Sequence, residues 1–262
     1  MRTLSLIWQY FVQYAKVRLA YRGDFLTSVV TTMMGALAGI AAVYLIFQRA
    51  PLIHGWSFNE ILFLYGFGLL PLSFFNFLSI NLYFFGDIYI VQGKFDRVLL
   101  RPVHTLVQIL FEQFRLEALG DTMLGLVVIW MTAPKLGIAL DLRFWLFAIV
   151  FTVLGAVLYL AIFISLTAVS FWMEDRVGII PPVYNMMAFG RYPLDIYGTP
   201  IKLMLSWVIP FGFAGFYPVA FLLGKEGMEV FAWLLPVVTA CFLLLAVLIW
   251  NRGVRNYSST GS

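Results

Sequence analysis

Few residues of this sequence have the types and spacing that chemistry requires. Lysine follows glycine at Gly93-Lys94 and at Gly224-Lys225, as in phosphate-cradling loops, but Phe or Glu follows where such a loop needs Ser or Thr. The two histidines, His54 and His104, are far apart, and the single cysteine, Cys241, lies in an apolar run. Catalytic and metal sites need several such groups together. The sequence therefore predicts no catalytic, metal-binding or cofactor-binding residue on this chain.

One partial match to an enzyme signature begins at Lys94. The run from Lys94 to Arg101-Pro102 fits K-x6-R-P, which resembles the first element of the lipid-phosphatase signature. In that family the basic side chains neutralise a phosphate that a downstream histidine attacks. No PSGH follows here, and His104 is only two residues beyond the proline. An intramembrane lipid-phosphate enzyme is therefore the least supported interpretation.

The composition identifies lipid as the solvent of this chain. Of its 262 residues 62% are hydrophobic and 11% charged, whereas soluble domains have about 45–50% apolar and roughly 25% charged residues. A soluble chain of this size needs a more polar shell. The net charge of +4 comes without a basic run that could follow phosphates. A cytosolic enzyme and a nucleic-acid binder are thus excluded. The apolar runs are continuous rather than alternating, so we expect an all-α polytopic membrane protein.

Six runs are long enough to cross a bilayer, whose core of ~30 Å takes about 20 apolar residues. They are residues 25–48, 61–82, 116–133, 144–173, 201–223 and 230–250. The fourth run exceeds one perpendicular crossing, so we expect it to tilt or to extend beyond the bilayer. The fifth contains Pro210 and Pro218 and follows a shorter apolar segment, 178–190, so its boundaries stay open. On the second run, Asn76 and Asn81 are expected to face the protein interior, because amides facing lipid are costly.

The basic residues predict the orientation of these six spans. Thirteen of the seventeen Lys and Arg, including Arg191 and Lys202, fall on the side that carries both termini. The other side has Arg49, Lys135, Arg143 and Lys225. Because basic residues concentrate in cytoplasmic loops, we expect both termini and the loop 83–115 to be cytoplasmic.

Two further segments lie outside the predicted spans. Residues 1–22 are amphipathic, with Trp8 and Phe11 on one helical face and Gln9 and Gln13 on the other, which favours a helix lying in the membrane interface. In the loop 83–115, a short helix over 93–104 has separate apolar and charged faces. Such a helix suits docking into a groove on a partner, and a solvated connector is the alternative.

This order of elements resembles the permease subunits of type-2 ABC exporters. An interfacial helix, two spans, a cytoplasmic coupling helix and four spans follow one another, and the resemblance covers the whole chain. It sharpens to the six-span branch often described as viologen-exporter-like. The segments that carry it are FDRVLLRP at 95–102, GRYP at 190–193 and WVIPF at 207–211.

The resemblance implies a permease of the bacterial plasma membrane that moves a hydrophobic or amphiphilic substrate outward. Two separate ATPase subunits would hold ATP and magnesium, and a second permease, related or identical, would complete the complex. The implied ATPase-coupling residues are Lys94, Phe95, Asp96, Arg97, Arg101, Pro102 and His104. Among them we expect Phe95 to be an exposed apolar anchor. A re-entrant segment before the last span is implied at Pro210, Gly212, Gly215 and Pro218.

A secondary carrier or channel without ATPase partners is the alternative function. Proton-coupled carriers usually place charged side chains in mid-bilayer, and the six predicted spans contain almost none. No inverted repeat is evident either. The sequence identifies neither the substrate nor the residues that bind it.

Overall fold

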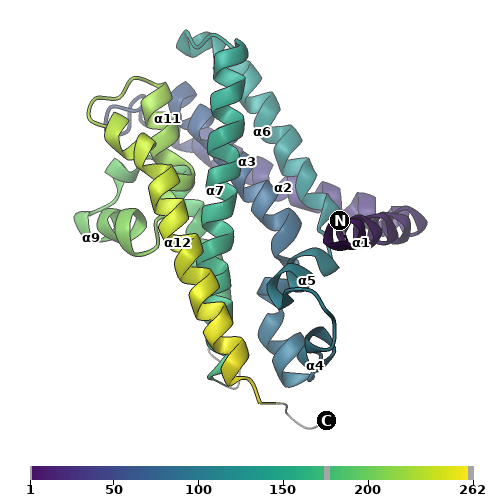
Figure 1. Ribbon diagram of the computed structural model, residues 1–262. Coiled ribbons are helices and arrows are strands. Elements are labelled where there is room, and N and C mark those ends of the chain that lie inside the picture. Colours follow the sequence, from purple (N-terminus) through teal and green to yellow (C-terminus); the bar gives the residue numbers. More distant parts are fainter. Residues whose placement is uncertain (1, 174–177, 259–262) are drawn as a thin grey trace.

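The structure is a computed structural model that describes residues 2–173 and 178–258. Within these residues all regular secondary structure is helical, which confirms the predicted all-α fold class (Figure 1). Long helices form the centre of the molecule, and two helices near the N-terminus extend away from it. Short helices lie at one side and at one end (Figure 1).

Among the described residues, four helices are long and apolar enough to cross a membrane. They are α2 (Arg22–Phe47), α3 (Phe58–Tyr83), α7 (Leu142–Ala168) and α12 (Glu229–Asn256). The shortest have 26 residues, which is ~39 Å at ~1.5 Å per residue and exceeds the hydrocarbon core. They correspond to the first, second, fourth and sixth predicted spans. Two of them continue, α3 as the π-helical turn η1 (Gly86–Val91) and α7 as the 3-10 turn η4 (Val169–Phe171).

The third and fifth predicted spans have a different structure. In the third, α6 (Leu119–Thr132) has only 14 residues and lies between the 3-10 turns η2 (Leu116–Ala118) and η3 (Pro134–Leu136). The segment 201–223, expected as a span interrupted by Pro210 and Pro218, is not one long helix. That region is divided into α9 (Thr199–Leu203), η7 (Met204–Val208), α10 (Phe211–Ala214) and α11 (Phe216–Leu222). Because Pro210 has no N–H to continue the helical hydrogen bonds, the chain breaks there.

The segment before α9 contains α8 (Ile180–Met186), η5 (Met187–Arg191) and η6 (Leu194–Ile196). A Cβ built on Gly68 would lie 2.7 Å from Arg191 Cγ, so Arg191 packs against the middle of α3. Farther on, the ring of Trp207 lies 6.3 Å from that of Phe231 in the first turn of α12. Arg191 and the helix that carries Lys202 are therefore not at the end of the molecule where the sequence placed them. Arg176, counted on the same side, lies outside the described residues.

The core is centred on α3, which packs on α6 and α7, while α7 packs on α12. Helices α3 and α6 are in close contact at Gly125. A Cβ built there would lie only 2.6 Å from the carbonyl oxygen of Gly66, so no larger residue fits. Small residues at such crossings let backbones of membrane helices approach. As predicted, Asn76 and Asn81 face the interior: both are buried, and Asn81 donates to the carbonyl of Ile109 at 2.7 Å.

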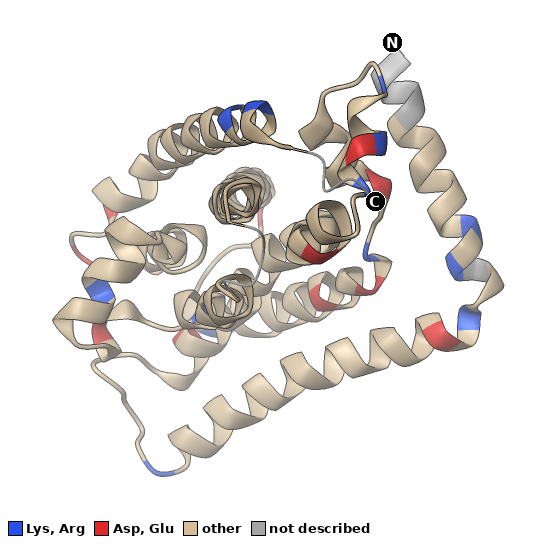
Figure 2. Cartoon of the chain, turned by 90° about the horizontal axis from the view of Figure 1, so that it is seen from below, with Lys and Arg blue, Asp and Glu red and all other residues tan. Residues whose placement is uncertain are grey.

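The first two helices frame one edge of the molecule. Figure 2 shows α1 (Arg2–Ala20) and α2 lengthwise, meeting at a corner and lying beside the central helices. The helix predicted over 1–22 is thus present. Phe11 holds it to the bundle by an edge contact with Phe114, whose ring centroid is 5.4 Å away. Helix α2 buries few side chains, Ala36 and Val43 among them.

The two ends of the bundle differ. One end, called here the α4 end, carries the short helices α4 (Phe95–Leu99) and α5 (Thr105–Glu112) and the last turns of α12 (Figure 1). At the opposite end, Lys225 forms a 2.8 Å ion pair with Glu60 and lies 4.5 Å from the ring centroid of Trp56. Glu60 also closes a capping box with Ser57 at the start of α3.

Candidate functional site

The predicted helix over 93–104 is shorter than expected. Gly93 has φ +65°, which suits glycine and turns the chain into α4. Helix α4 ends at Leu99, and α5 begins only at Thr105. Pro102 lies in the turn between them, as expected of a residue that cannot donate a backbone hydrogen bond. The structure therefore has two short helices joined by a turn at this position.

Phe95 is fully buried, so the prediction that it is an exposed anchor is wrong. Its ring lies against Phe85, Phe171 and Tyr257, with centroid distances of 5.9, 5.1 and 4.9 Å. These rings come from the ends of α3, α7 and α12, which meet over α4. The most exposed apolar residue of the segment is instead Leu100, with 84% of its surface accessible.

Polar side chains of the segment join it to neighbouring helices. Arg101 Nη1 donates to the hydroxyl of Tyr10 on α1 at 2.6 Å, and His104 Nε2 lies 3.2 Å from Asn251 Oδ1 on α12. Asp96 lies beside Tyr257, and burial together with this carboxylate raises the pKa of Tyr257 to about 12. Displacing the segment would therefore disturb both α1 and α12.

Three basic residues of the segment gather around a small hollow. Lys94, Arg97 and Arg101 line a cavity of about 150 Å³ together with Glu112. Glu112 Oε2 accepts a 2.6 Å hydrogen bond from the hydroxyl of Tyr89. The predicted coupling residues thus share one end of the molecule, with Phe95 inside it and the basic residues around it.

The predicted re-entrant residues are brought together in the broken segment. Pro210 precedes α10, and Pro218 lies in the first turn of α11; most residues of both short helices are buried. A Cβ at Gly212 would lie 2.6 Å from Leu194 Cδ1, and one at Gly215 would lie 2.6 Å from the carbonyl oxygen of Gly190. The glycines therefore allow η5 and η6 to cross closely over α10 and α11.

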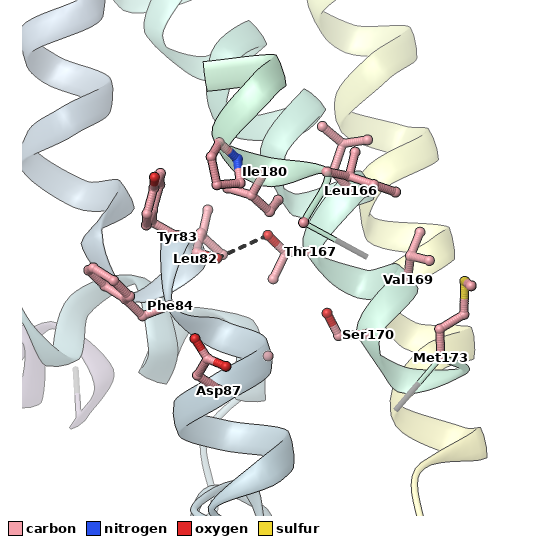
Figure 3. A pocket seen from close by; sticks show the side chains of 14 residues that line it. Leu82, Tyr83, Phe84, Asp87, Leu166, Thr167, Val169, Ser170, Met173 and Ile180 are labelled. Atoms are coloured by element: carbon pink, nitrogen blue, oxygen red, sulfur yellow. Dashed lines mark hydrogen bonds between the residues drawn. The ribbon is translucent and has the colours of Figure 1, made fainter. Parts of the chain in front are cut away.

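Two cavities flank the α3 terminus at the α4 end. The smaller, about 200 Å³, lies between this terminus, the end of α7 and residues 178–181 (Figure 3). Thr167 Oγ1 donates to the carbonyl of Leu82 across it at 3.3 Å (Figure 3). The larger, about 580 Å³, is bounded by α1, α2, α3 and residues 113–117. Tyr83 and Phe84 line both cavities.

The larger cavity was missed by the reasoning from sequence. Its polar lining includes Arg18, Arg115 and Glu117, and hydroxyl groups of α2. The available signal was the pair of dipeptides Thr27-Ser28 and Thr31-Thr32, because four hydroxyl residues at helical spacing in an apolar run indicate a polar face.

Two charged residues that the sequence placed near the membrane surface, Asp121 and Arg191, are packed inside the bundle. Asp121 is buried in the first turn of α6, and its Oδ1 has no hydrogen-bond partner among the described residues. Arg191 lies over the ring of Tyr65, 5.1 Å from the centroid, and its Nε is buried without such a partner. In the described part of the chain, no group of three or more His, Cys, Asp or Glu could hold a metal ion.

The comparisons with known proteins give the family. The family model described as "ABC-2 family transporter protein" matches residues 33–261, which is most of the chain. Comparison with curated proteins and with solved structures finds no significant match. The family match, the helical fold and the apolar helices agree with one another. The chain therefore belongs to the ABC-2 transporter family and is a component of membrane transport.

Proposed function

We propose that this chain is the transmembrane subunit of an ATP-driven exporter of hydrophobic or amphiphilic substrates. The family match over residues 33–261 carries the proposal. The chain has no GxxxxGK[ST] loop of its own, so ATP and magnesium would be held by two separate ATPase subunits. A second permease, related or identical, completes the complex. Both termini and the α4 end face the cytoplasm of a bacterial cell.

The ATPase subunits dock on the α4 end. Leu100 offers an apolar side chain there, and Arg97 and Arg101 are exposed beside it. An exposed apolar residue within a charged rim is the usual composition of a small protein interface. The remaining predicted coupling residues border this surface and hold it to the neighbouring helices: Lys94, Asp96, Pro102 and His104. Phe95 supports the surface from the buried aromatic cluster beneath it.

The buried ring of Phe95 connects the proposed docking surface to the membrane helices, so that a movement of this surface can be transmitted to them. Its ring contacts Phe171, which follows α7, and Tyr257, which follows α12. Arg101 meanwhile contacts α1 through Tyr10. A rigid-body shift of α4 on ATP binding would therefore move the ends of three helices together, because packed aromatic clusters transmit displacement rather than absorb it. In this mechanism the broken segment around Pro210, Gly212, Gly215 and Pro218 re-enters from the outer face.

A substitution that introduces a charge at the proposed docking surface tests this function. The full chain, affinity-purified in mild detergent from its own membranes, is assayed for ATP hydrolysis and for co-purifying subunits by mass spectrometry. Leu100→Glu should lower the co-purified ATPase activity about tenfold, which corresponds to ~1.4 kcal/mol of interface energy. Leu52→Glu is the matched control, because it makes the same substitution at an exposed leucine between α2 and α3. This variant should keep the co-purified ATPase activity of the wild type. Wild-type chain without any associated ATPase would contradict the proposal.

One observation favours a second candidate, a secondary carrier. Charged side chains inside the bundle are typical of ion-coupled transport, and Asp121 and Arg191 are such charges. A carrier would transport its substrate from liposomes that contain the purified chain alone, driven by an ion gradient without ATP. The exporter requires the ATPase subunits in the same assay.

A further inference from the structure

The larger cavity, about 580 Å³ between α1, α2, α3 and residues 113–117, has a volume within the range of ligand sites. Two of the helices that bound it, α1 and α2, meet at the edge of the molecule (Figure 2), and residues of both line the cavity. Ile80 and Phe84 supply apolar lining, and charged and hydroxyl groups supply the rest. It can therefore take a ligand with a polar head and an apolar continuation.

Glu117 is the buried charge of this cavity. Only 3% of its side chain is exposed. Its Oε1 forms an ion pair with Arg18 Nη2 at 3.0 Å, but its Oε2 has no hydrogen-bond partner among the described residues. Leaving a buried acceptor unpaired costs about 1–3 kcal/mol, and more when it is charged. Because Glu117 lines the cavity, a ligand bound there can supply the missing donor, and a charged donor suits a carboxylate best.

The hydroxyl groups of α2 are acceptors toward the cavity as well. Thr27 Oγ1 donates to the carbonyl of Gly23 at 2.9 Å, and Thr31 Oγ1 to that of Thr27 at 2.8 Å. Since their protons are used within the helix, their oxygen lone pairs are left for a donor in the cavity. Glu117 and α2 together therefore favour an ammonium group.

Arg115 favours an anionic group of the ligand, in contrast to Glu117 and the hydroxyl groups of α2. Its backbone N–H donates to the carbonyl of Phe77 at 3.0 Å, which fixes the residue beside α3. Its half-buried side chain lines the same cavity and forms no ion pair with any residue that the structure describes. A guanidinium group binds phosphate through paired hydrogen bonds and carries its charge at every physiological pH. Arg115 therefore favours a phosphate.

We propose that this cavity binds the zwitterionic head group of an aminophospholipid-like amphiphile. The phosphate lies at Arg115, the primary ammonium donates to Glu117 Oε2, and the first methylenes lie along Ile80 and Phe84. The inference rests on the proposed function in one respect: it names the class of substrate that the exporter would take from the cytoplasmic leaflet. Binding itself requires neither ATP nor an ATPase subunit.

Four probes test the head group on the purified full chain in detergent. They are dihexanoyl-phosphatidylethanolamine, the corresponding phosphatidylcholine and phosphatidylglycerol, and free phosphoethanolamine, each titrated by calorimetry. Phosphatidylethanolamine should bind about tenfold tighter than phosphatidylcholine, whose ammonium has no N–H to donate, and about tenfold tighter than phosphatidylglycerol, which has no cation. Equal affinity for the three lipids would overturn the proposal. Free phosphoethanolamine binding as tightly as the lipid would overturn the assignment to an amphiphile.

Variants locate the binding site. Arg115→Gln and Glu117→Gln should each lower the affinity for phosphatidylethanolamine about tenfold. Glu117→Gln also weakens the contact with Arg18, whereas Arg115→Gln breaks no ion pair of the described chain and so tests the site without loosening α1. Arg143→Gln and Glu226→Gln, which make the same changes on exposed residues outside the cavity, should bind as wild type does.

Retained affinity in both cavity variants would overturn the proposal. The result is separable from the proposed function. Lipid binding that persists in a chain without associated ATPase contradicts only the exporter, and ATPase association without lipid binding contradicts only this site.

Discussion

At the scale of single residues, the two ends of α4 have different surroundings: one end is packed in the core and the other is exposed. Phe95 is inside an aromatic cluster, whereas Leu100 is almost fully exposed. Phe95→Ala should destabilise the protein by about 3–5 kcal/mol, because it leaves a cavity among packed rings. Leu100→Ala should change stability by less than ~0.5 kcal/mol. Thermal unfolding of both variants in detergent measures the difference, and equal stability would show that Phe95 is not packed as described.

The close crossing at Gly215 gives a second prediction at this scale. Gly215→Ala should destabilise the protein by about 1–3 kcal/mol, because its Cβ would lie 2.6 Å from a backbone oxygen of Gly190, which cannot rotate away. Gly35→Ala serves as the control, since a Cβ there meets no atom within 4 Å. The same unfolding assay compares them. A Gly215→Ala protein as stable as the control would mean that the two segments are not in contact.

Single residues were predictable where their own chemistry decided their position. Asn76 and Asn81 had to face inward, because an amide in an apolar helix needs a partner. The stripe that contains Phe95 was also visible. What covers that stripe is set by Phe171 and Tyr257, which are distant in sequence. Periodicity shows which face of a helix is apolar but not whether the chain itself or a partner covers it.

At the scale of elements, α5 is joined to the end of α12 by a hydrogen bond whose donor is buried. Trp250 is fully buried, and its Nε1 donates to Thr105 Oγ1 at 3.0 Å. Thr105→Val should destabilise the protein by about 1–3 kcal/mol, because the indole N–H loses its acceptor without access to water. Adding Trp250→Phe removes that donor. In a double-mutant cycle the two losses should therefore sum to more than the loss of the double variant; strict additivity would argue against the bond.

Element prediction succeeded for uninterrupted apolar runs and failed where proline and glycine divide them. The four long helices match their predicted spans within a few residues. The run 201–223 is also largely apolar, yet Pro210 and Gly215 divide it into short helices that pack inside the molecule. Hydropathy reports how strongly side chains prefer any apolar environment, so it does not distinguish a segment that faces lipid from one that is buried in protein. Freed backbone groups can persist in a membrane only where protein or a water-filled cavity satisfies them.

At the scale of the whole molecule, the two ends differ in ways that set its orientation. The α4 end has the proposed docking surface, and the opposite end has the Glu60–Lys225 ion pair. Setting aside Arg191, Lys202 and Arg176, which lies outside the described residues, leaves ten of the thirteen basic residues first counted on the α4 side against four on the other side. The asymmetry therefore survives the correction, and the α4 end is expected to be cytoplasmic.

Cysteine labelling in intact cells measures this orientation. In a Cys241→Ala background, which removes the exposed native thiol, Lys135→Cys should react with a membrane-impermeant maleimide added outside. Arg97→Cys should react only after the membrane is opened. Both side chains are exposed, so unequal labelling reports the side of the membrane rather than burial. The reverse pattern would place the proposed docking surface outside the cell, where no ATP is available, and would remove the physical basis for an ATPase at that end.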